Sequence, residues 1–501
     1  MFRKIIRYFV LLGCCGTIHG LCAQTTDSLI VQKIKAEGML HSKVMEHAFY
    51  LTDVNGPRLT NSPGLKKAEE WAVQTLKQWG LKNVNLEPFG DYGYGWQIRR
   101  SYIAMTAPYY HALIGVPRAW SGSTEGLTQS DVVLISPDSS EIKKYKDKLR
   151  DKAIIFDTND TLSTSFTPDA YRLTAADIAA MDTPLVVHHI TSKGRITWAD
   201  KKRIDDLLFE TGASIVLRKA WGKHGTVFTG WSADYAVDAH PVLPDMEVSG
   251  EDYLRMVRLL KAGHKVTVEA DIQTSLNKET STGYNVIAEI PGTDPKLKHE
   301  VVMLGAHIDS WHGATGATDN AAGVAVVMEA MRILKKLDIA PKRTIRLALW
   351  SGEEEGLWGS KGYVANHFGD KDHPKPEYYS ISAYYNLDNG AGKIRGIYMQ
   401  ANPAVKPIFE KWLEPFHDLG AVTVANRIAI STDHIPFDAV GIPGFQFVQD
   451  KLEYFPRTHH SNQDTYDRLI ADDLRQASVV LAAFVFNTAQ YPVKIPRKKM
   501  E

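Results

Sequence analysis

Histidine and acidic residues of the kind that bind metal ions gather in the middle of this chain, around two short apolar runs. The runs cover residues 301–306 and 344–350, and an apolar helical segment, residues 321–337, lies between them. The metal-binding types lie just after a run or just before the helix: His307, Asp309, Asp319, Glu353 and Glu354. Two parallel strands joined by a helix form a βαβ unit, which places such residues at one edge of a sheet.

These residue types indicate hydrolysis by a metal-activated water. Imidazole and carboxylate groups without thiolates suit a pair of zinc ions that keep an open position for water. Asp388 follows another apolar run, residues 382–387, and His460 lies in a later loop, so both are candidate ligands. Bound metal lowers the pKa of water from 15.7 to about 7, and Glu353, next to a candidate ligand, could then accept the proton.

Asp309 is the candidate for orienting a ligand. It lies two residues beyond His307 in an extended segment, so the two side chains point to the same side. Its carboxylate could accept the second N–H of the imidazole. Each motif alone has a common structural explanation, but their order beside predicted strand ends favours one shared site.

Helical and strand-like segments around this unit predict an α/β fold. Residues 63–80 and 472–491 have apolar residues at helical spacing, and residues 284–290 are typical of a strand. Arg58 precedes the first of these helices. We expect Arg58 at the surface or as a cap, rather than in contact with substrate.

The middle of the chain has a different sequence pattern. Between about residues 116 and 275, short β-rich runs alternate with charged, helix-like pieces. A chain of 501 residues is long enough for two or three domains. We therefore predict an inserted domain over residues 117–274 and a catalytic domain made from residues 24–116 and 275–501.

Residues 1–23 have the layout of a secretory signal, because basic residues precede an apolar run and small residues follow it up to Ala23. The run is shorter than the roughly 20 apolar residues of a spanning helix, so a membrane anchor is less favoured. Cleavage before Cys14, with a lipid on that cysteine, is an alternative. We expect an exported protein, periplasmic or extracellular, without a spanning segment.

The charges of the chain argue against nucleic acid as a partner. Lys and Arg together number 58, as do Asp and Glu, so no global field attracts a polyanion. The three cysteines all lie in the N-terminal segment, at positions 14, 15 and 22. A chain cleaved after Ala23 would have no disulfide, and we expect it to depend on its core and on bound metal.

Several motifs in order make the chain resemble a known family. They are GAHIDSWHGATGATDNAAG, WSGEEEGLWGS, NLDN, STDHIPF and HHSNQDT, with GPRLTNSPG near the start. The chain is similar to the co-catalytic dizinc exopeptidases of the aminopeptidase Y and glutamate carboxypeptidase superfamily, in the branch of carboxypeptidase Q and its bacterial relatives. The resemblance implies a phosphorylase/hydrolase-like three-layer αβα sandwich with an inserted protease-associated-type β-rich domain.

The resemblance also implies two Zn²⁺ ions per chain and roles for individual residues. The implied ligands are His307 and Asp388 for one ion, Glu354 and His460 for the other, and Asp319 as the bridge. Glu353 is similar in position to the family's general base. His460 is preferred over His459 because the family pattern is His, Ser or Thr, two variable residues, an acid and Thr.

Three further residues are expected near the substrate. His459 stands where some relatives carry a tyrosine that steadies the oxyanion, and it could donate in the same way or lie exposed. Asp433 and His434 lie in a loop that borders the substrate pocket in relatives. They could bind the free amino group of a peptide or cap a turn.

The implied activity is hydrolysis of short peptides or dipeptides with a free N-terminus, as a dipeptidase or an aminopeptidase. Family members are often homodimers, but no stretch of this chain identifies an interface. A single-zinc glutaminyl cyclase and a non-catalytic receptor-like homologue stay open as alternatives. His307 and Asp388 argue for two metals, and the filled ligand and base positions argue against a purely binding role. Peptide specificity depends on pocket walls that these motifs do not describe.

Overall fold

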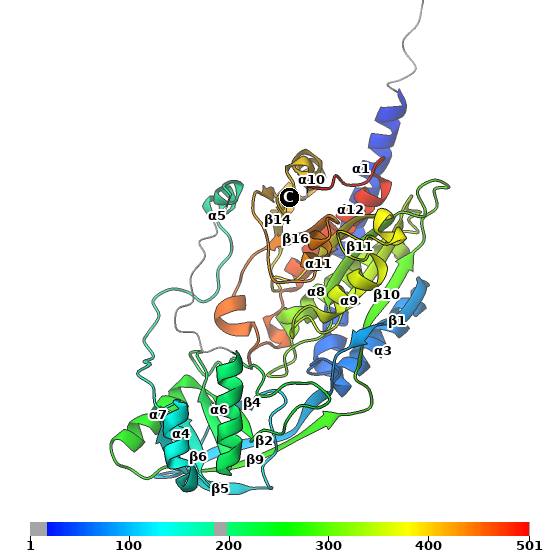
Figure 1. The fold of residues 1–501 in the computed structure, drawn as a ribbon. Helices are drawn as coiled ribbons and strands as arrows, with labels where there is room; N and C mark the ends of the chain where they lie inside the picture. Colours follow the sequence, from blue (N-terminus) through cyan, green and yellow to red (C-terminus); the bar gives the residue numbers. More distant parts are fainter. Residues whose placement is uncertain (1–17, 185–197, 500–501) are drawn as a thin grey trace, which may run out of the picture.

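The computed structural model of the protein describes residues 18–184 and 198–499. Within this part of the chain, the strands form two sheets of eight strands each. The sheets occupy the two ends of an elongated molecule, with long strands β2 (Gly95–Ala107) and β9 (Thr267–Asn277) in the second (Figure 1). The predicted α/β class is confirmed.

The first sheet is mixed, with a parallel centre. Its order is β1-β10-β12-β11-β13-β16-β14-β15. The bounds are β1 Lys82–Asp91, β10 Thr282–Ile290, β11 Val301–His307, β12 Thr344–Trp350, β13 Ile381–Asn386, β14 Ile394–Tyr398, β15 Thr423–Ala425 and β16 Gly444–Gln449. Strand β11 pairs in parallel with β12 and β13, and β13 pairs in parallel with β16. Their carboxyl ends therefore meet at one edge of the sheet.

Helices cover both faces of this sheet and make three layers. Along β11, Val302 and Leu304 belong to a core shared with helices α8 and α12, whereas Val301 and Met303 belong to a core shared with α9 and α11. This alternation is the period of two that a strand buried on both faces requires. The helices are α1 Ile18–Leu40, α2 Val44–Phe49, α3 Pro63–Gln78, α8 Ala322–Lys336, α9 Trp358–His367, α10 Lys406–Leu413, α11 His434–Ala439 and α12 Ala471–Gln490.

The second sheet has the order β3-β2-β9-β5-β6-β7-β8-β4. Its other strands are β3 His111–Ala112, β4 Gly115–Pro117, β5 Thr128–Ile135, β6 Ala153–Phe156, β7 Ile215–Lys219 and β8 Asp245–Val248. The helices that pack on this sheet are α4 Ser139–Tyr145, α6 Trp198–Thr211 and α7 Gly250–Lys261. Helix α5 Ala175–Ala179 lies in the same stretch of chain but contacts β15 of the first sheet. Helix α7 packs on one face, and α4 and α6 pack on the other.

The strands of the second sheet span more of the chain than the predicted insertion, residues 117–274. Strand β2 begins at Gly95 and pairs along most of its length with β9, which ends at Asn277. We call the part of the chain from Gly95 to Asn277 the second unit. Its independence as a domain stays a prediction.

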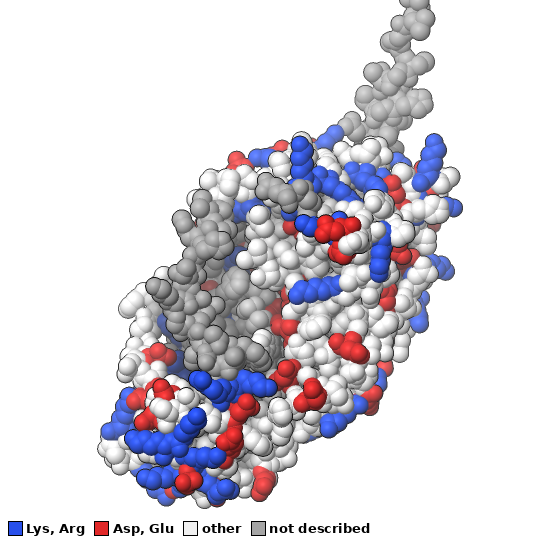
Figure 2. Space-filling model, in the orientation of Figure 1, with Lys and Arg blue, Asp and Glu red and all other residues white. Residues whose placement is uncertain are grey.

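The surface carries mixed charges. Figure 2 shows Lys and Arg interspersed with Asp and Glu on the visible face, in keeping with the zero formal net charge. Across the described ranges, none of the helices combines the length and the apolar character needed to cross a membrane. The predicted signal, residues 1–23, lies largely outside the described residues, which begin with helix α1 at Ile18.

Candidate metal centre

The carboxyl ends of β11, β12 and β13 bring predicted ligands together. His307 is the last residue of β11, and Asp388 follows β13. The Nε2 atom of His307 lies 3.4 Å from Asp388 Oδ1 and 3.4 Å from Asp319 Oδ1. The carboxylate of Glu353, which follows β12, lies 4.0 Å from the same nitrogen. One imidazole therefore faces three carboxylates.

A second group of donors faces the other oxygen of Asp319. His460 Nε2 lies 3.2 Å from Asp319 Oδ2 and 3.0 Å from Glu354 Oε2. His459 stacks on His460 with ring centroids 3.6 Å apart, and its Nε2 lies 3.9 Å from Asp319 Oδ2. Asp319 thus presents one oxygen to each group, as a bridging carboxylate would. His459 is also within reach of a metal ion beside His460.

Asp319 is held in place by a non-helical turn before α8. Its φ of −133° and ψ of 88° depart from helical values, and its peptide bond to Asn320 is cis. The Asn320 side chain accepts from the Gly323 N–H at 3.0 Å and donates to the Leu387 carbonyl at 2.9 Å. The Asp464 carboxylate accepts the Asp319 N–H at 3.1 Å. Asp319 is therefore tied to the loop of His460, and its neighbour Asn320 is tied to the end of β13.

Asp309 lies where it can orient His307, as the spacing suggested. His307 Nδ1 lies 3.2 Å from the carbonyl oxygen of Asp309 and 3.5 Å from its carboxylate, so the backbone makes the shorter contact. The carboxylate accepts the N–H of Glu354 at 3.2 Å, and the Thr60 hydroxyl lies 3.2 Å away. Asp309 therefore links a candidate ligand on β11 to one after β12.

The buried polar atoms at the centre fit a metal ion. Among the described residues, His307 Nε2 and Asp319 Oδ2 are buried and make no well-aligned hydrogen bond, although charged groups lie 3.2–3.4 Å away. Such atoms are costly unless they are paired, and coordination of a cation would satisfy both. Imidazole nitrogens and carboxylate oxygens are the donor set that suits zinc.

The charges at the centre are strongly coupled. Burial raises the pKa of Glu353 well above its usual range, and burial together with the Asp319 carboxylate raises the pKa of Glu354 to about 7. Burial opposes protonation of His460, but the carboxylates of Glu354 and Asp319 outweigh it and raise its pKa to about 10. Protons on these groups must leave when a cation binds, so metal affinity should depend on pH.

The two residues predicted in the substrate-pocket loop have different surroundings. Asp433 is buried and accepts a hydrogen bond from the Ser360 hydroxyl at 2.5 Å, and burial raises its pKa to about 8. His434 Nε2 lies 3.0 Å from the Gln400 amide nitrogen and 3.2 Å from the Ala429 carbonyl. Burial lowers the pKa of His434 to about 4. Their roles toward a substrate stay predictions.

For Arg58, the expected surface position is wrong, whereas the expected capping role fits the structure, because the guanidinium donates to the Leu51 carbonyl of the helical segment Tyr50–Val54 at 2.9 Å. The Arg58 side chain is fully buried, and it donates to the carbonyls of Ile308 at 2.7 Å, Thr315 at 2.6 Å and Gly316 at 3.0 Å. These carbonyls belong to the turn between His307 and Asp319. No sequence pattern indicated these three contacts, because their acceptors lie some 250 positions away along the chain.

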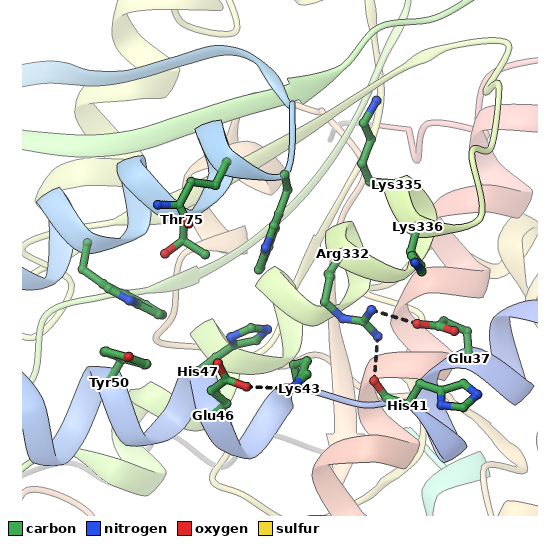
Figure 3. Close-up of a pocket in the computed structure, with 13 residues that line it drawn as sticks. Glu37, His41, Lys43, Glu46, His47, Tyr50, Thr75, Arg332, Lys335 and Lys336 are labelled. Carbon is green, nitrogen blue, oxygen red and sulfur yellow. Dashed lines mark hydrogen bonds and ion pairs between the residues drawn. The ribbon is translucent and has the colours of Figure 1, made fainter.

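A separate cavity of about 990 Å³ lies between helices α1, α2, α3 and α8. Figure 3 shows Arg332 in it, bonded to the Glu37 carboxylate and the His41 carbonyl. None of the candidate metal ligands lines this cavity. We place the candidate active site at the sheet edge because the metal-binding donors converge there. The size of the cavity alone does not indicate a reaction.

An α/β sheet whose strand ends carry two donor groups joined by one carboxylate defines a metallohydrolase-type centre. Residues 285–485 match the model of peptidase family M28, and this region contains all of the candidate ligands. This similarity supports a metallo-exopeptidase, the class of enzyme that the sequence predicted.

Two relatives agree with this assignment, one along most of the chain and one along about a third of it. Carboxypeptidase Q of Rattus norvegicus is 26% identical over 462 residues, which cover 92% of this chain and 88% of that protein. Leupeptin-inactivating enzyme 1 of Streptomyces exfoliatus is 33% identical over 196 residues, 36% of this chain and 42% of that one.

Solved structures share the fold. The crystal structure of a peptidase M28 precursor from Shewanella amazonensis has a TM-score of 0.69 at 24% identity and covers 95% of this chain and 100% of its own. An aminopeptidase from Aneurinibacillus has a TM-score of 0.55 at 20% identity, covering 95% and 98%.

Proposed function

We propose that this protein is an exported dizinc exopeptidase that hydrolyses short peptides or dipeptides with a free N-terminus. The observation that carries the proposal is the bridging geometry of Asp319, whose two oxygens face His307 at 3.4 Å and His460 at 3.2 Å. The similarity to carboxypeptidase Q along 92% of the chain supports the choice of small peptides. The basic and apolar N-terminal segment supports export.

The residues of the chain divide the work of hydrolysis. His307 and Asp388 would hold one zinc ion, Glu354 and His460 the other, with Asp319 shared between them. When bound, the zinc pair would polarise the scissile carbonyl and lower the pKa of the attacking water. Glu353 would take the proton of that water and pass it to the leaving amine. Asp309 would keep the His307 ring oriented.

One dipeptide in three forms tests the substrate class: with both termini free, N-acetylated, and C-amidated. Cleavage of the doubly free form alone would identify a dipeptidase. Cleavage of the amide as well, but not of the acetylated form, would identify an aminopeptidase. Cleavage of the acetylated form would contradict the requirement for a free N-terminus.

The zinc content of the purified protein separates the proposal from the remaining alternatives. A dizinc peptidase should hold two zinc ions per chain, whereas a single-zinc glutaminyl cyclase should hold one. A receptor-like homologue would show no turnover of any of the three dipeptide forms, whatever its zinc content.

A further inference from the structure

The loop that carries His460 is bonded to the second unit. The backbone N–H of Thr229 donates to the His460 carbonyl at 2.8 Å, and the Thr229 hydroxyl lies 3.1 Å from the same oxygen. Asn462 closes the contact from both sides: its N–H donates to the Val227 carbonyl at 3.0 Å, and its Oδ1 accepts the Val227 N–H at 2.8 Å. Its amide nitrogen also donates to the Gly225 carbonyl at 3.1 Å.

The segment that makes these bonds, residues 225–229, is anchored in the second unit. The Val227 side chain is fully buried in a small core with Val116 and Ala220. Directly after the segment, the Gly230 carbonyl accepts the N–H of Ala119 at 3.0 Å. We call residues 225–229 the docking segment. Because it is fixed at its own end, it can serve as a rigid support for the His460 loop.

His460 needs external support more than His307 does. Its backbone has φ of 58°, in the left-handed region that non-glycine residues rarely adopt. Its side chain is 32% exposed, whereas that of His307 is 1% exposed at the end of a buried strand. The first ligand is thus positioned by the sheet itself, and the second depends on a loop held by hydrogen bonds.

We infer that the docking segment positions His460. The second unit would then control the zinc affinity of the site formed by Glu354 and His460, and leave the affinity of the site formed by His307 and Asp388 unchanged. The inference rests on the proposed dizinc function. Thr229 and Asn462 are positioning residues, since they touch the ligand's backbone or its loop and none of the reacting atoms. Residues that orient a metal ligand typically change metal affinity by about 10–100-fold when they are removed.

The test is zinc titration of the metal-free protein against a competing chelator, which resolves two dissociation constants. Asn462→Ala removes both side-chain bonds to the docking segment, and we expect one zinc to bind at least tenfold more weakly while the other stays within twofold. Thr229→Val keeps the size of the side chain and the backbone hydrogen bond but removes the hydroxyl contact. We therefore expect it to weaken the binding of the same ion less, by about threefold. This second variant keeps the test available if Asn462→Ala does not fold.

His460→Ala identifies which constant belongs to the second ion, and Asn366→Ala, at an exposed position of α9, is the matched control. General destabilisation of the protein would weaken the binding of both zinc ions alike. An equal loss of affinity at both sites would therefore overturn the inference. Two unchanged constants in both positioning variants would overturn it as well. A wild-type protein that binds fewer than two zinc ions would overturn the dizinc function itself, which is a separate outcome.

Discussion

Glu353 and Glu354 are neighbours in sequence but differ in their contacts. Glu354 lies 3.0 Å from His460 Nε2 and accepts the Trp311 N–H at 3.2 Å, so both of its oxygens are engaged. Glu353 approaches His307 only to 4.0 Å. A carboxylate that remains outside the closest donor contacts, yet beside them, suits proton transfer better than metal binding.

Glu353→Gln should therefore lower kcat by about 10²–10⁴-fold, the usual contribution of a general base. Zinc content should stay at the wild-type value, because the amide replaces a group that is not a proposed ligand. The measurement is steady-state hydrolysis of a free dipeptide together with zinc analysis of the same sample. Glu354→Gln is the matched control, and it should lose zinc. Wild-type turnover in Glu353→Gln would show that another group is the base.

Arg58 yields a prediction about stability. Burial lowers the pKa of its guanidinium to about 10, but nearby carboxylates, led by Asp464 and Asp309, favour the charged form. Arg58→Met should leave buried carbonyls unpaired and those carboxylates without a cation. We expect a loss of about 3 kcal/mol in the free energy of unfolding, measured by urea denaturation of the metal-free protein. Arg58→Lys keeps the positive charge but can make fewer hydrogen bonds, so it should lose less unfolding free energy than Arg58→Met. Equal stability of all three proteins would contradict this account.

At the scale of elements, helix α9 is fastened to strand β1 through His367. Its Nε2 lies 2.6 Å from Glu87, its Nδ1 lies 3.0 Å from Glu377, and its ring stacks on Tyr363. The hydrogen bond to Glu87 is the main cause that raises the pKa of His367 above its ordinary 6.5. The protonated ring therefore joins two acidic segments.

A raised folded-state pKa gives stability that is fully present below about pH 6.5 and is lost as the pH rises through the folded value. The difference in unfolding free energy between the wild type and His367→Gln should thus be larger at pH 6 than at pH 9. Partial exposure limits the change to about 0.5 kcal/mol. Urea unfolding at the two pH values measures it, with the exposed His373→Gln as the control. An unchanged difference between pH 6 and pH 9 would contradict the ion pair.

The elements that the sequence predicted well are those whose apolar pattern is local. The runs at 301–306 and 344–350 correspond to β11 and β12, and the segment at 472–491 corresponds to α12, Ala471–Gln490. Strand β2 was not predicted, because exposed Arg99 and Arg100 interrupt its pattern and its stability comes from pairing with distant β9. A strand that is stabilised mainly by pairing with a strand distant in sequence need not show an alternating apolar pattern in its own residues.

At the scale of the whole molecule, the centre joins parts of the chain that are far apart. Asp464 accepts backbone N–H groups from Thr318 and Asp319 while its loop is bonded to the docking segment. The sequence motifs supplied the candidate ligands, and the structure brings them together at one sheet edge. The contact between the His460 loop and residues 225–229 could not be predicted, because its partners lie more than 230 positions apart along the chain and every bond has a main-chain atom, which carries no residue-specific pattern, on at least one side.

Metal removal should therefore lower the stability of the folded protein. Without a cation, the carboxylates of Asp319, Glu353, Glu354 and Asp388 lie near one another with side chains at most 11% exposed. A ligand that binds only the folded state stabilises it by mass action. Free zinc at 100 times its dissociation constant should add about 2.7 kcal/mol per site. Thermal unfolding of chelator-treated protein, before and after zinc is restored, measures this effect as a rise in Tm. In His307→Ala, zinc should raise the Tm by less than in the wild type, because only the zinc site of His460 remains intact. A Tm that zinc does not change would mean that these donors do not form a metal centre.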